Sequence, residues 1–220
     1  MRQLNLQILF TILFLAYQNF AVTDIKGFSP IKINEFQRQK DAKQFLGPSY
    51  NLSYAKKAEN SLSLHKKLNS FIQKKLHTEY SKKSFSLTET IIKEAQVHNL
   101  DPVLIASLIY VESKYDPMTV GAHGEIGLMQ IKPSTAQWQA KKYKLKFTKN
   151  DLFVPEKNVK IGILYLAYLR SRIVDHPQKF ITAYNMGESR GKKFTTSTYL
   201  RKVLTSYNDS YSYIIKADKI

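Results

Sequence analysis

The feature that most constrains the fold is a long apolar stretch between residues 156 and 174. Its length and its many large aliphatic side chains are typical of a buried central α-helix, which Pro177 would end. Its apolar positions are Val159, Ile161, Ile163, Leu164, Leu166 and Leu169. Elsewhere, segments that alternate apolar and polar residues as strands do are scarce. The sequence therefore predicts a mainly α fold around this helix.

Helix-start signals indicate where several other helices begin. Ser86–Glu89 has the spacing of a capping box, in which the two end residues satisfy each other's backbone N–H groups. Asp101 followed by Pro102 supplies an N-cap and a first-turn proline. Such signals predict helices over about 86–98, 101–114, from 133 onward, 178–186 and 197–207. Gly121, Gly124 and Gly127 crowd the segment before residue 133, which predicts a short glycine-rich loop or small β-hairpin.

The first 23 residues have the layout of a secretory signal. No residue between Gln3 and Thr23 is charged, Arg2 precedes this stretch, and Ile8–Ala16 is an almost continuous apolar run. The run is too short to span a membrane comfortably, because a spanning helix needs about 20 apolar residues. We expect export to the periplasm or cell envelope, or secretion, with cleavage near Ala21–Thr23 or retention as an N-terminal membrane anchor.

The rest of the chain divides into three parts. Residues 24–84 are predicted to hold an irregular segment, to about residue 60, and a basic amphipathic helix. Residues 85–208 form the predicted domain, and residues 209–220 a polar tail. Glycines and prolines at positions 27, 30, 47 and 48 are the reason for the irregular prediction.

The strongly positive net charge of the chain favours polyanionic surroundings. The chain has 34 lysine and arginine residues against 17 acidic residues, a formal net charge of +17. Lysine doublets recur between residues 56 and 83, alternating with apolar residues at helical spacing. This segment is interpreted as a solvated helix face, or as an attachment site for anionic wall polymer or a membrane surface. Nucleic acid is not an expected partner, because no RNA- or DNA-reading motif accompanies the charge.

Several classes of enzyme are excluded or disfavoured by composition. The chain has no cysteine, which excludes disulfides, thiolate nucleophiles and iron–sulfur ligation. Its five histidines lack the spacing of a metalloprotease helix. It has neither a phosphate-binding glycine loop nor a Gly-x-Ser-x-Gly elbow. No metal and no cofactor is expected.

Glu112 is the leading catalytic candidate. On the predicted helix over 101–114 it shares a face with Leu108 and Ile109, and Tyr115 follows just after the helix. An apolar environment would raise the pKa of this carboxyl and keep it protonated near neutral pH, as a general acid requires. The alternative is an exposed glutamate at a helix C-terminus.

The sequence after this glutamate carries an ordered set of short motifs. They are Glu112-Ser113, Gly127-Leu128-Met129-Gln130, Ala183-Tyr184-Asn185 and, later, Tyr199. Each is common alone, but their order and spacing together resemble the catalytic domain of soluble lytic transglycosylases. That family belongs to the lysozyme-like superfamily and cuts peptidoglycan. The resemblance covers about residues 85–208.

The resemblance implies a single lysozyme-like domain and a specific reaction. Glu112 would be the sole acid/base, cleaving the glycan strand after N-acetylmuramic acid to leave a 1,6-anhydro end without consuming water. The substrate-binding residues implied are Ser113, Gly127, Met129, Gln130, Tyr184, Asn185 and Tyr199. The sequence departs from the family pattern at Glu125, where a small residue is common, and at Thr196, where a glutamate is common. A third departure is 187–191, where Gly-Pro-Gly is frequent.

Two alternatives stay open. A muramidase of the same fold would hydrolyse with water and would need a second carboxylate, for which Asp116 and Glu125 are candidates, although Asp116 before Pro117 is typical of a turn. A non-catalytic wall-binding or secretion-apparatus scaffold would keep the fold alone. For any of these, the partner beyond peptidoglycan could be a secretion or conjugation apparatus.

Overall fold

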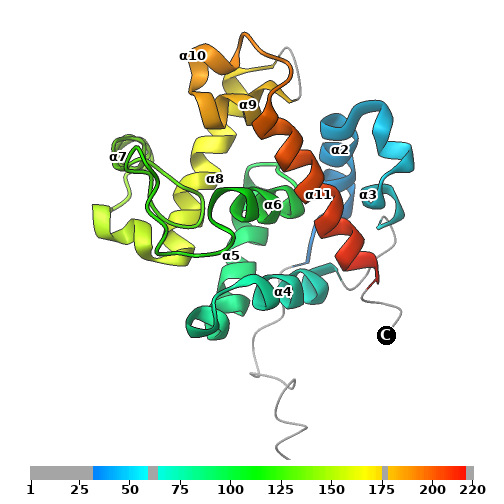
Figure 1. Cartoon of the computed structure of the whole chain (residues 1–220), viewed down its shortest axis with the longest axis horizontal. Coiled ribbons are helices and arrows are strands. Elements are labelled where there is room, and N and C mark those ends of the chain that lie inside the picture. Colours follow the sequence, from blue (N-terminus) through cyan, green and yellow to red (C-terminus); the bar gives the residue numbers. More distant parts are fainter. Residues whose placement is uncertain (1–31, 59–63, 175–177, 217–220) are drawn as a thin grey trace, which may run out of the picture. The chain divides into compact units, whose positions relative to one another are not determined.

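The computed structural model describes residues 32–58, 64–174 and 178–216. The predicted signal at 1–23, its proposed cleavage site and Pro177 lie outside these residues. Helices make up most of the described chain, and the predicted mainly α class is confirmed (Figure 1). Its elements are α2 (Glu35–Leu46), η1 (Gly47–Leu52), α3 (Tyr54–Lys57), α4 (Leu64–Lys75), η2 (Thr78–Lys83), α5 (Ser84–Val97), α6 (Pro102–Ser113), α7 (Pro133–Lys142), η3 (Lys149–Phe153), α8 (Pro155–Arg172), α9 (Lys179–Met186), α10 (Glu188–Gly191) and α11 (Thr198–Lys216).

Helix α8 is the buried central helix that the apolar stretch predicts. All six of the predicted apolar positions are buried, and α8 contacts α5, α7 and α9. It begins with Pro155 in its first turn, where the missing N–H costs no hydrogen bond, and ends at Arg172. None of the helices in the described ranges is long and apolar enough to cross a membrane.

Helix α6 begins as its sequence signal predicts. The Asp101 side chain accepts a hydrogen bond from the N–H of Val103, and Pro102 occupies the first turn. Helix α11 packs along α6 (Figure 1). The hydroxyls of Tyr207 and Tyr211 both donate hydrogen bonds to Asp101. The N-cap residue of α6 is thereby attached to the second half of α11.

The prediction of an irregular segment is wrong for residues 35–57. Asn34 caps α2 by accepting a hydrogen bond from the N–H of Gln37, and Gly47, at φ +56°, ends it. The breaking residues thus lie outside the helix rather than within it. Buried Phe45 and Leu46 attach α2 to the core.

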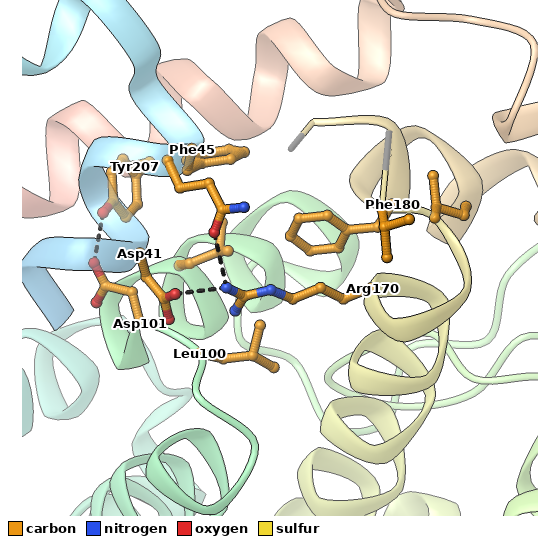
Figure 2. Close-up of a pocket in the computed structure, with 11 residues that line it drawn as sticks. Asp41, Phe45, Leu100, Asp101, Arg170, Phe180 and Tyr207 are labelled. Carbon is orange, nitrogen blue, oxygen red and sulfur yellow. Dashed lines mark hydrogen bonds and ion pairs between the residues drawn. The ribbon is translucent and has the colours of Figure 1, made fainter. Parts of the chain in front are cut away.

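Ion pairs and hydrogen bonds also hold α2 in place. Arg170 of α8 pairs with Asp41 at 2.6 Å, and Arg38 donates a hydrogen bond to the hydroxyl of Tyr211 at 2.7 Å. Figure 2 shows Asp41 and Arg170 meeting at the wall of a small cavity of about 150 Å³, with Tyr207 directed at Asp101. A partner for each buried charge offsets the cost of removing it from water.

Three further boundaries correct the sequence analysis. The capping-box prediction at Ser86 is wrong, because α5 starts at Ser84 and the Ser86 hydroxyl donates to Glu156 of α8 instead, at 2.6 Å. Within the described part of the basic segment, Lys56 and Lys57 end α3, and the predicted amphipathic helix is present as α4, followed by η2. The predicted polar tail is helical to Lys216, because burial of Tyr211 and Ile214 continues the packed face of α11.

The glycine-rich segment is a loop, which is one of the two forms predicted for it, the other being a small β-hairpin. Two isolated β-bridges join Val120 to Ile126 and Ile126 to Ile131. In this part of the described chain they form no longer ladder. The loop connects the end of α6 to the start of α7 and therefore lies beside Glu112.

Candidate active site

Glu112 lies in the last turn of α6, where the chain turns sharply. Lys114 and Tyr115 both adopt positive φ, at +52° and +68°. The cost of this conformation is offset because the Tyr115 side chain is fully buried and its hydroxyl donates to the carbonyl of Ala106 at 2.8 Å. The sharp turn ends α6 directly after Glu112 and leads the chain into the glycine-rich loop.

The carboxyl of Glu112 lines a cavity of about 680 Å³. The other residues of its wall come from the glycine-rich loop, α7, α8, α9 and α10. They are His123, Glu125, Gln130, Ile131, Lys132, Thr135, Tyr165, Tyr184, Asn185, Met186, Gly187 and Arg190. This volume is sufficient for a small molecule or a short segment of an oligosaccharide.

The environment of Glu112 makes it a proton donor near neutral pH. Burial is the largest effect on the pKa of this carboxyl and raises it to about 7. The charge of Glu125 also raises this pKa, whereas the hydrogen bond from Tyr199 lowers it. Tyr199 donates its hydroxyl proton to Oε1 of Glu112. Burial, the Glu112 charge and this bond raise the pKa of Tyr199 well above its usual value, so the phenol stays neutral.

Gln130 and Met129 lie together on the glycine-rich loop but face different surroundings. Gln130 lines the cavity, and its amide donates to the carbonyls of Thr119 and Gly127, both at 3.0 Å. Met129 is fully buried and packs on Gly162 of α8, where an added Cβ would lie 2.4 Å from its sulfur. The structure thus places Gln130 at the cavity surface and Met129 behind it.

Asn158 of α8 fastens this loop. Its carbonyl oxygen accepts from the N–H of Met129 at 2.8 Å, and its amide donates to the carbonyls of Ile126 and Leu152, each at 2.8 Å. Sequence reasoning missed this residue. The available signal was an amide directly before the apolar positions that begin at Val159, since a buried amide requires hydrogen-bond partners.

Gly127 and Ser113 also lie behind the cavity wall. Gly127 has φ +79°, and an added Cβ would lie 2.3 Å from both Asn158 Nδ2 and Leu152 O, so this glycine permits close packing within the protein. The hydroxyl of Ser113 donates to the carbonyls of Leu128 at 2.9 Å and Ile109 at 3.2 Å. Both residues hold the loop against its neighbours.

Tyr184 and Asn185 stand side by side at the end of α9 and both line the cavity. The Tyr184 hydroxyl donates to the carbonyl of Met129 at 2.8 Å, and its ring contacts that of Tyr165. Asn185 is exposed, so its amide is free to meet a ligand. The structure therefore brings Glu112, Gln130, Tyr184 and Asn185 to one cavity.

Glu125 is a second carboxylate in the cavity wall. Burial raises its pKa, but the N–H groups of Glu125 and His123 and the ammonium of Lys132 outweigh this and hold the pKa below its usual value. The Lys132 ammonium lies 3.4 Å from its carboxylate. Glu125 is therefore charged at neutral pH, while the raised pKa of Glu112 leaves part of its population protonated. No group of three His, Asp or Glu side chains in the described ranges is arranged to hold a metal ion.

Comparison with known proteins identifies relatives of this chain. It is 34 % identical over 101 residues to the membrane-bound lytic murein transglycosylase E of Buchnera aphidicola, which covers 44 % of this chain and 45 % of that protein. It is 34 % identical over 107 residues to the membrane-bound lytic murein transglycosylase C of Histophilus somni, with 44 % and 30 % covered. The chain thus matches less than half the length of these curated relatives.

A solved structure and a family model complete the comparison. The lytic transglycosylase Slt of Pseudomonas aeruginosa, solved as an inactive mutant, aligns with 91 % of this chain and 38 % of its own, at 19 % identity and a TM-score of 0.47. The model of the transglycosylase SLT domain matches residues 89–203, which is just over half of the chain and includes Glu112, Tyr184 and Tyr199. The chain therefore belongs to the transglycosylase SLT family.

Proposed function

We propose that this protein is a lytic transglycosylase that cleaves peptidoglycan glycan strands between N-acetylmuramic acid and N-acetylglucosamine. The observation that carries the proposal is Glu112, a carboxyl with a pKa of about 7 in the wall of a 680 Å³ cavity and hydrogen-bonded to Tyr199. A group with a pKa near the working pH serves both as acid and as base. Membership of the SLT family supports the same reaction.

The proposed reaction uses Glu112 twice. The protonated carboxyl gives its proton to the glycosidic oxygen as the bond to C1 of the muramic residue breaks. The resulting carboxylate then takes the proton of the C6 hydroxyl of that same residue while its oxygen bonds to C1. The products are a free N-acetylglucosamine end and a 1,6-anhydro-N-acetylmuramic acid end. Protons balance, Glu112 is regenerated, and no water is consumed.

The remaining cavity residues are proposed to bind the sugar. Gln130 and Asn185 offer amides to acetamido and hydroxyl groups, and Tyr184 offers a ring beside the cavity. Ser113, Gly127 and Met129 act indirectly, because they hold the loop that carries Gln130. Tyr199 acts on Glu112 through their hydrogen bond.

A muramidase is the second candidate, and Glu125 favours it. This residue is a charged carboxylate in the same cavity as Glu112, whose pKa burial raises to about 7. That pairing is what a hydrolase with separate acid and base requires. Product mass separates the two reactions, because an anhydro end is lighter by one water than a reducing end.

The test is digestion of purified peptidoglycan followed by mass spectrometry of the products. We expect anhydromuropeptides from the native chain and none from Glu112→Gln, while Glu125→Gln keeps the anhydro product. Reducing ends that the native chain produces and Glu125→Gln does not would identify a muramidase. Equal digestion by native chain and Glu112→Gln would exclude Glu112 as the acid, and no digestion by either would leave only a binding scaffold.

We also propose that the protein acts in the cell envelope. The curated relatives are described as membrane-bound, and the basic segment at 56–83 would favour an anionic surface. Fractionation of cells expressing the full chain, with and without residues 1–23, tests this location. Retention of the full chain in the cytosol would contradict it.

A further inference from the structure

Helix α10 is held rigidly beside the cavity by contacts at both of its ends. At its start, Glu188 accepts hydrogen bonds from the hydroxyl of Tyr168 at 2.8 Å and from the ammonium of Lys192 at 2.6 Å. At its end, Gly191 packs so closely on α9 that an added Cβ would lie 2.2 Å from the Cα of Ala183.

Arg190 lies between these two anchors and carries an unpaired charge. Its side chain is exposed, lines the cavity and makes no ion pair or side-chain hydrogen bond with any other residue in the described ranges. The neighbouring carboxylate of Glu188 is already taken by Tyr168 and Lys192. The backbone of Arg190 is fixed, and its guanidinium is left available to a ligand.

The charges of the cavity wall give Arg190 no internal partner. Glu125 is matched by Lys132, and Glu112 is bonded to the neutral Tyr199. A guanidinium at a cavity binds a carboxylate through two parallel hydrogen bonds, which is stronger and more specific than a neutral contact. The chemistry of the site therefore calls for an anionic group on the ligand, near Asn185 and Met186, which line the same wall.

We propose that Arg190 binds a carboxylate of the peptide substituent carried by N-acetylmuramic acid, and so makes the enzyme selective for peptide-bearing glycan strands. This inference rests on the proposed function, since it assumes a peptidoglycan strand in the cavity. The sugar itself is uncharged at its hydroxyl and acetamido groups, so the peptide arm supplies the anion. Arg190 acts in substrate selection and takes no part in proton transfer.

The test compares enzyme variants on substrates that differ only in peptide charge. Soluble glycan strands with free peptide carboxylates are assayed beside strands whose carboxylates have been converted to amides. For the native chain we expect amidation to lower kcat/KM about tenfold, mostly through KM. For Arg190→Gln we expect a similar loss on free strands and no further loss on amidated ones. Arg190→Lys, which keeps the charge, recovers part of the activity.

Lys193→Gln is the matched control. It removes one positive charge from an exposed residue three positions further on, which does not line the cavity. We expect it to behave as the native chain on both substrates. Equal sensitivity of native chain and Arg190→Gln to amidation would overturn the proposal.

A third substrate separates two sources of carboxylate. Strands stripped of peptide expose the lactyl carboxylate of muramic acid instead. If Arg190→Gln loses activity on stripped strands as it does on peptide-bearing ones, Arg190 accepts the lactyl carboxylate as well, and the proposed selectivity for the peptide is wrong. We expect the stripped strands to be insensitive to the substitution.

Binding to Glu112→Gln gives a readout that does not need turnover. Calorimetry with short peptide-bearing and amidated fragments measures the charge preference of the cavity in Glu112→Gln and in Glu112→Gln combined with Arg190→Gln. If the Arg190→Gln substitution abolishes the preference for charged peptide, the inference is supported even if the enzyme proves to be a hydrolase. An absent preference overturns it even if the products are anhydromuropeptides.

Discussion

The hydroxyl of Tyr199 on α11 donates a hydrogen bond to Oε1 of Glu112 on α6, across 87 positions of sequence. Burial favours the neutral carboxyl, whereas this bond favours the carboxylate. The pKa of about 7 is the balance of these opposing effects with the charge of Glu125. The contact thus couples the tyrosine to the pH range in which Glu112 exchanges its proton.

Removing the Tyr199 hydroxyl is expected to move the pH profile upward. Tyr199→Phe deletes a donor that stabilises the charged carboxyl, so the pKa of Glu112 rises above about 7. Activity that needs the protonated acid then persists to higher pH, although its maximum falls because a weaker acid gives its proton to the glycosidic oxygen less readily. The pH dependence of kcat/KM measures this shift. Tyr143→Phe, at an exposed residue outside the cavity wall, should leave the profile in place. A profile displaced to lower pH would contradict the assignment.

Replacing Glu112 is expected to make the protein more stable than the native chain, by an amount that grows as pH rises. The pKa of this carboxyl is about 7 when folded, against 4.5 for an ordinary glutamate. A raised pKa means that the folded state binds more protons than the unfolded one, so native stability falls between pH 4.5 and about 7. Glu112→Gln lacks this loss and gains on the order of 3 kcal/mol relative to the native chain over the same window.

Urea unfolding at pH 4.5 and at pH 8 measures that gain. The stability difference between Glu112→Gln and the native chain should be larger at the higher pH. Glu79→Gln, at an exposed position of η2, is the control and should show no such pH dependence. A gain that is constant across pH would mean that burial does not penalise the charge of Glu112.

Loss of the Asn158 amide is expected to release the glycine-rich loop. Asn158→Ala removes three hydrogen bonds and leaves the N–H of Met129 and the carbonyls of Ile126 and Leu152 without this partner. We expect a loss of about 2–4 kcal/mol in the free energy of unfolding and a lower activity, because Gln130 loses its support. Thermal unfolding and a turnover assay measure both. Asn150→Ala, at an exposed position, should change stability by less than about 0.5 kcal/mol.

Two glycines of the same loop separate backbone strain from crowding. Gly124 and Gly127 both have φ +79°, but only Gly127 has neighbours within reach of an added Cβ. Gly124→Ala should therefore cost about 1–2 kcal/mol from the backbone alone. Gly127→Ala should cost a further 1–3 kcal/mol through contact with Asn158 and Leu152. Chemical denaturation of the two variants gives the comparison, and equal losses would show that the loop moves to accommodate the methyl group.

Local sequence signals predicted those elements whose cause is local. The Asp101–Pro102 start of α6 and the apolar content of α8 each act within their own helix, and both are confirmed. The failures have long-range causes. Ser86 does not cap its helix because α5 begins two residues earlier, at Ser84, and the Ser86 hydroxyl donates to Glu156, 70 positions away. The sequence analysis did not predict α2, because the helical pattern of its residues is weak. Its stability comes from Phe45 and Leu46, which are buried against distant parts of the chain.

For the site, sequence identified the chemistry better than the supporting structure. An apolar face at the end of a helix predicted the environment of Glu112, and its pKa is raised by burial as that face implies. The roles of Gly127 and Met129 depend on α8, whose contact with the loop no spacing rule supplies. Which residues face the cavity and which lie behind it is therefore set by tertiary packing. Their assignment to the substrate stays a prediction.

The attachment of Tyr207 and Tyr211 to Asp101 bears on how short a working fragment of this protein can be. Helix α11 touches α6 near both of its ends, through Tyr199 at Glu112 and through these two tyrosines at the N-cap. The family match ends at residue 203, before either tyrosine. A fragment trimmed to that boundary would keep every residue of the cavity wall, yet the helix presenting Tyr199 would lose its far attachment. Expression plans for an isolated catalytic unit should therefore extend through residue 216.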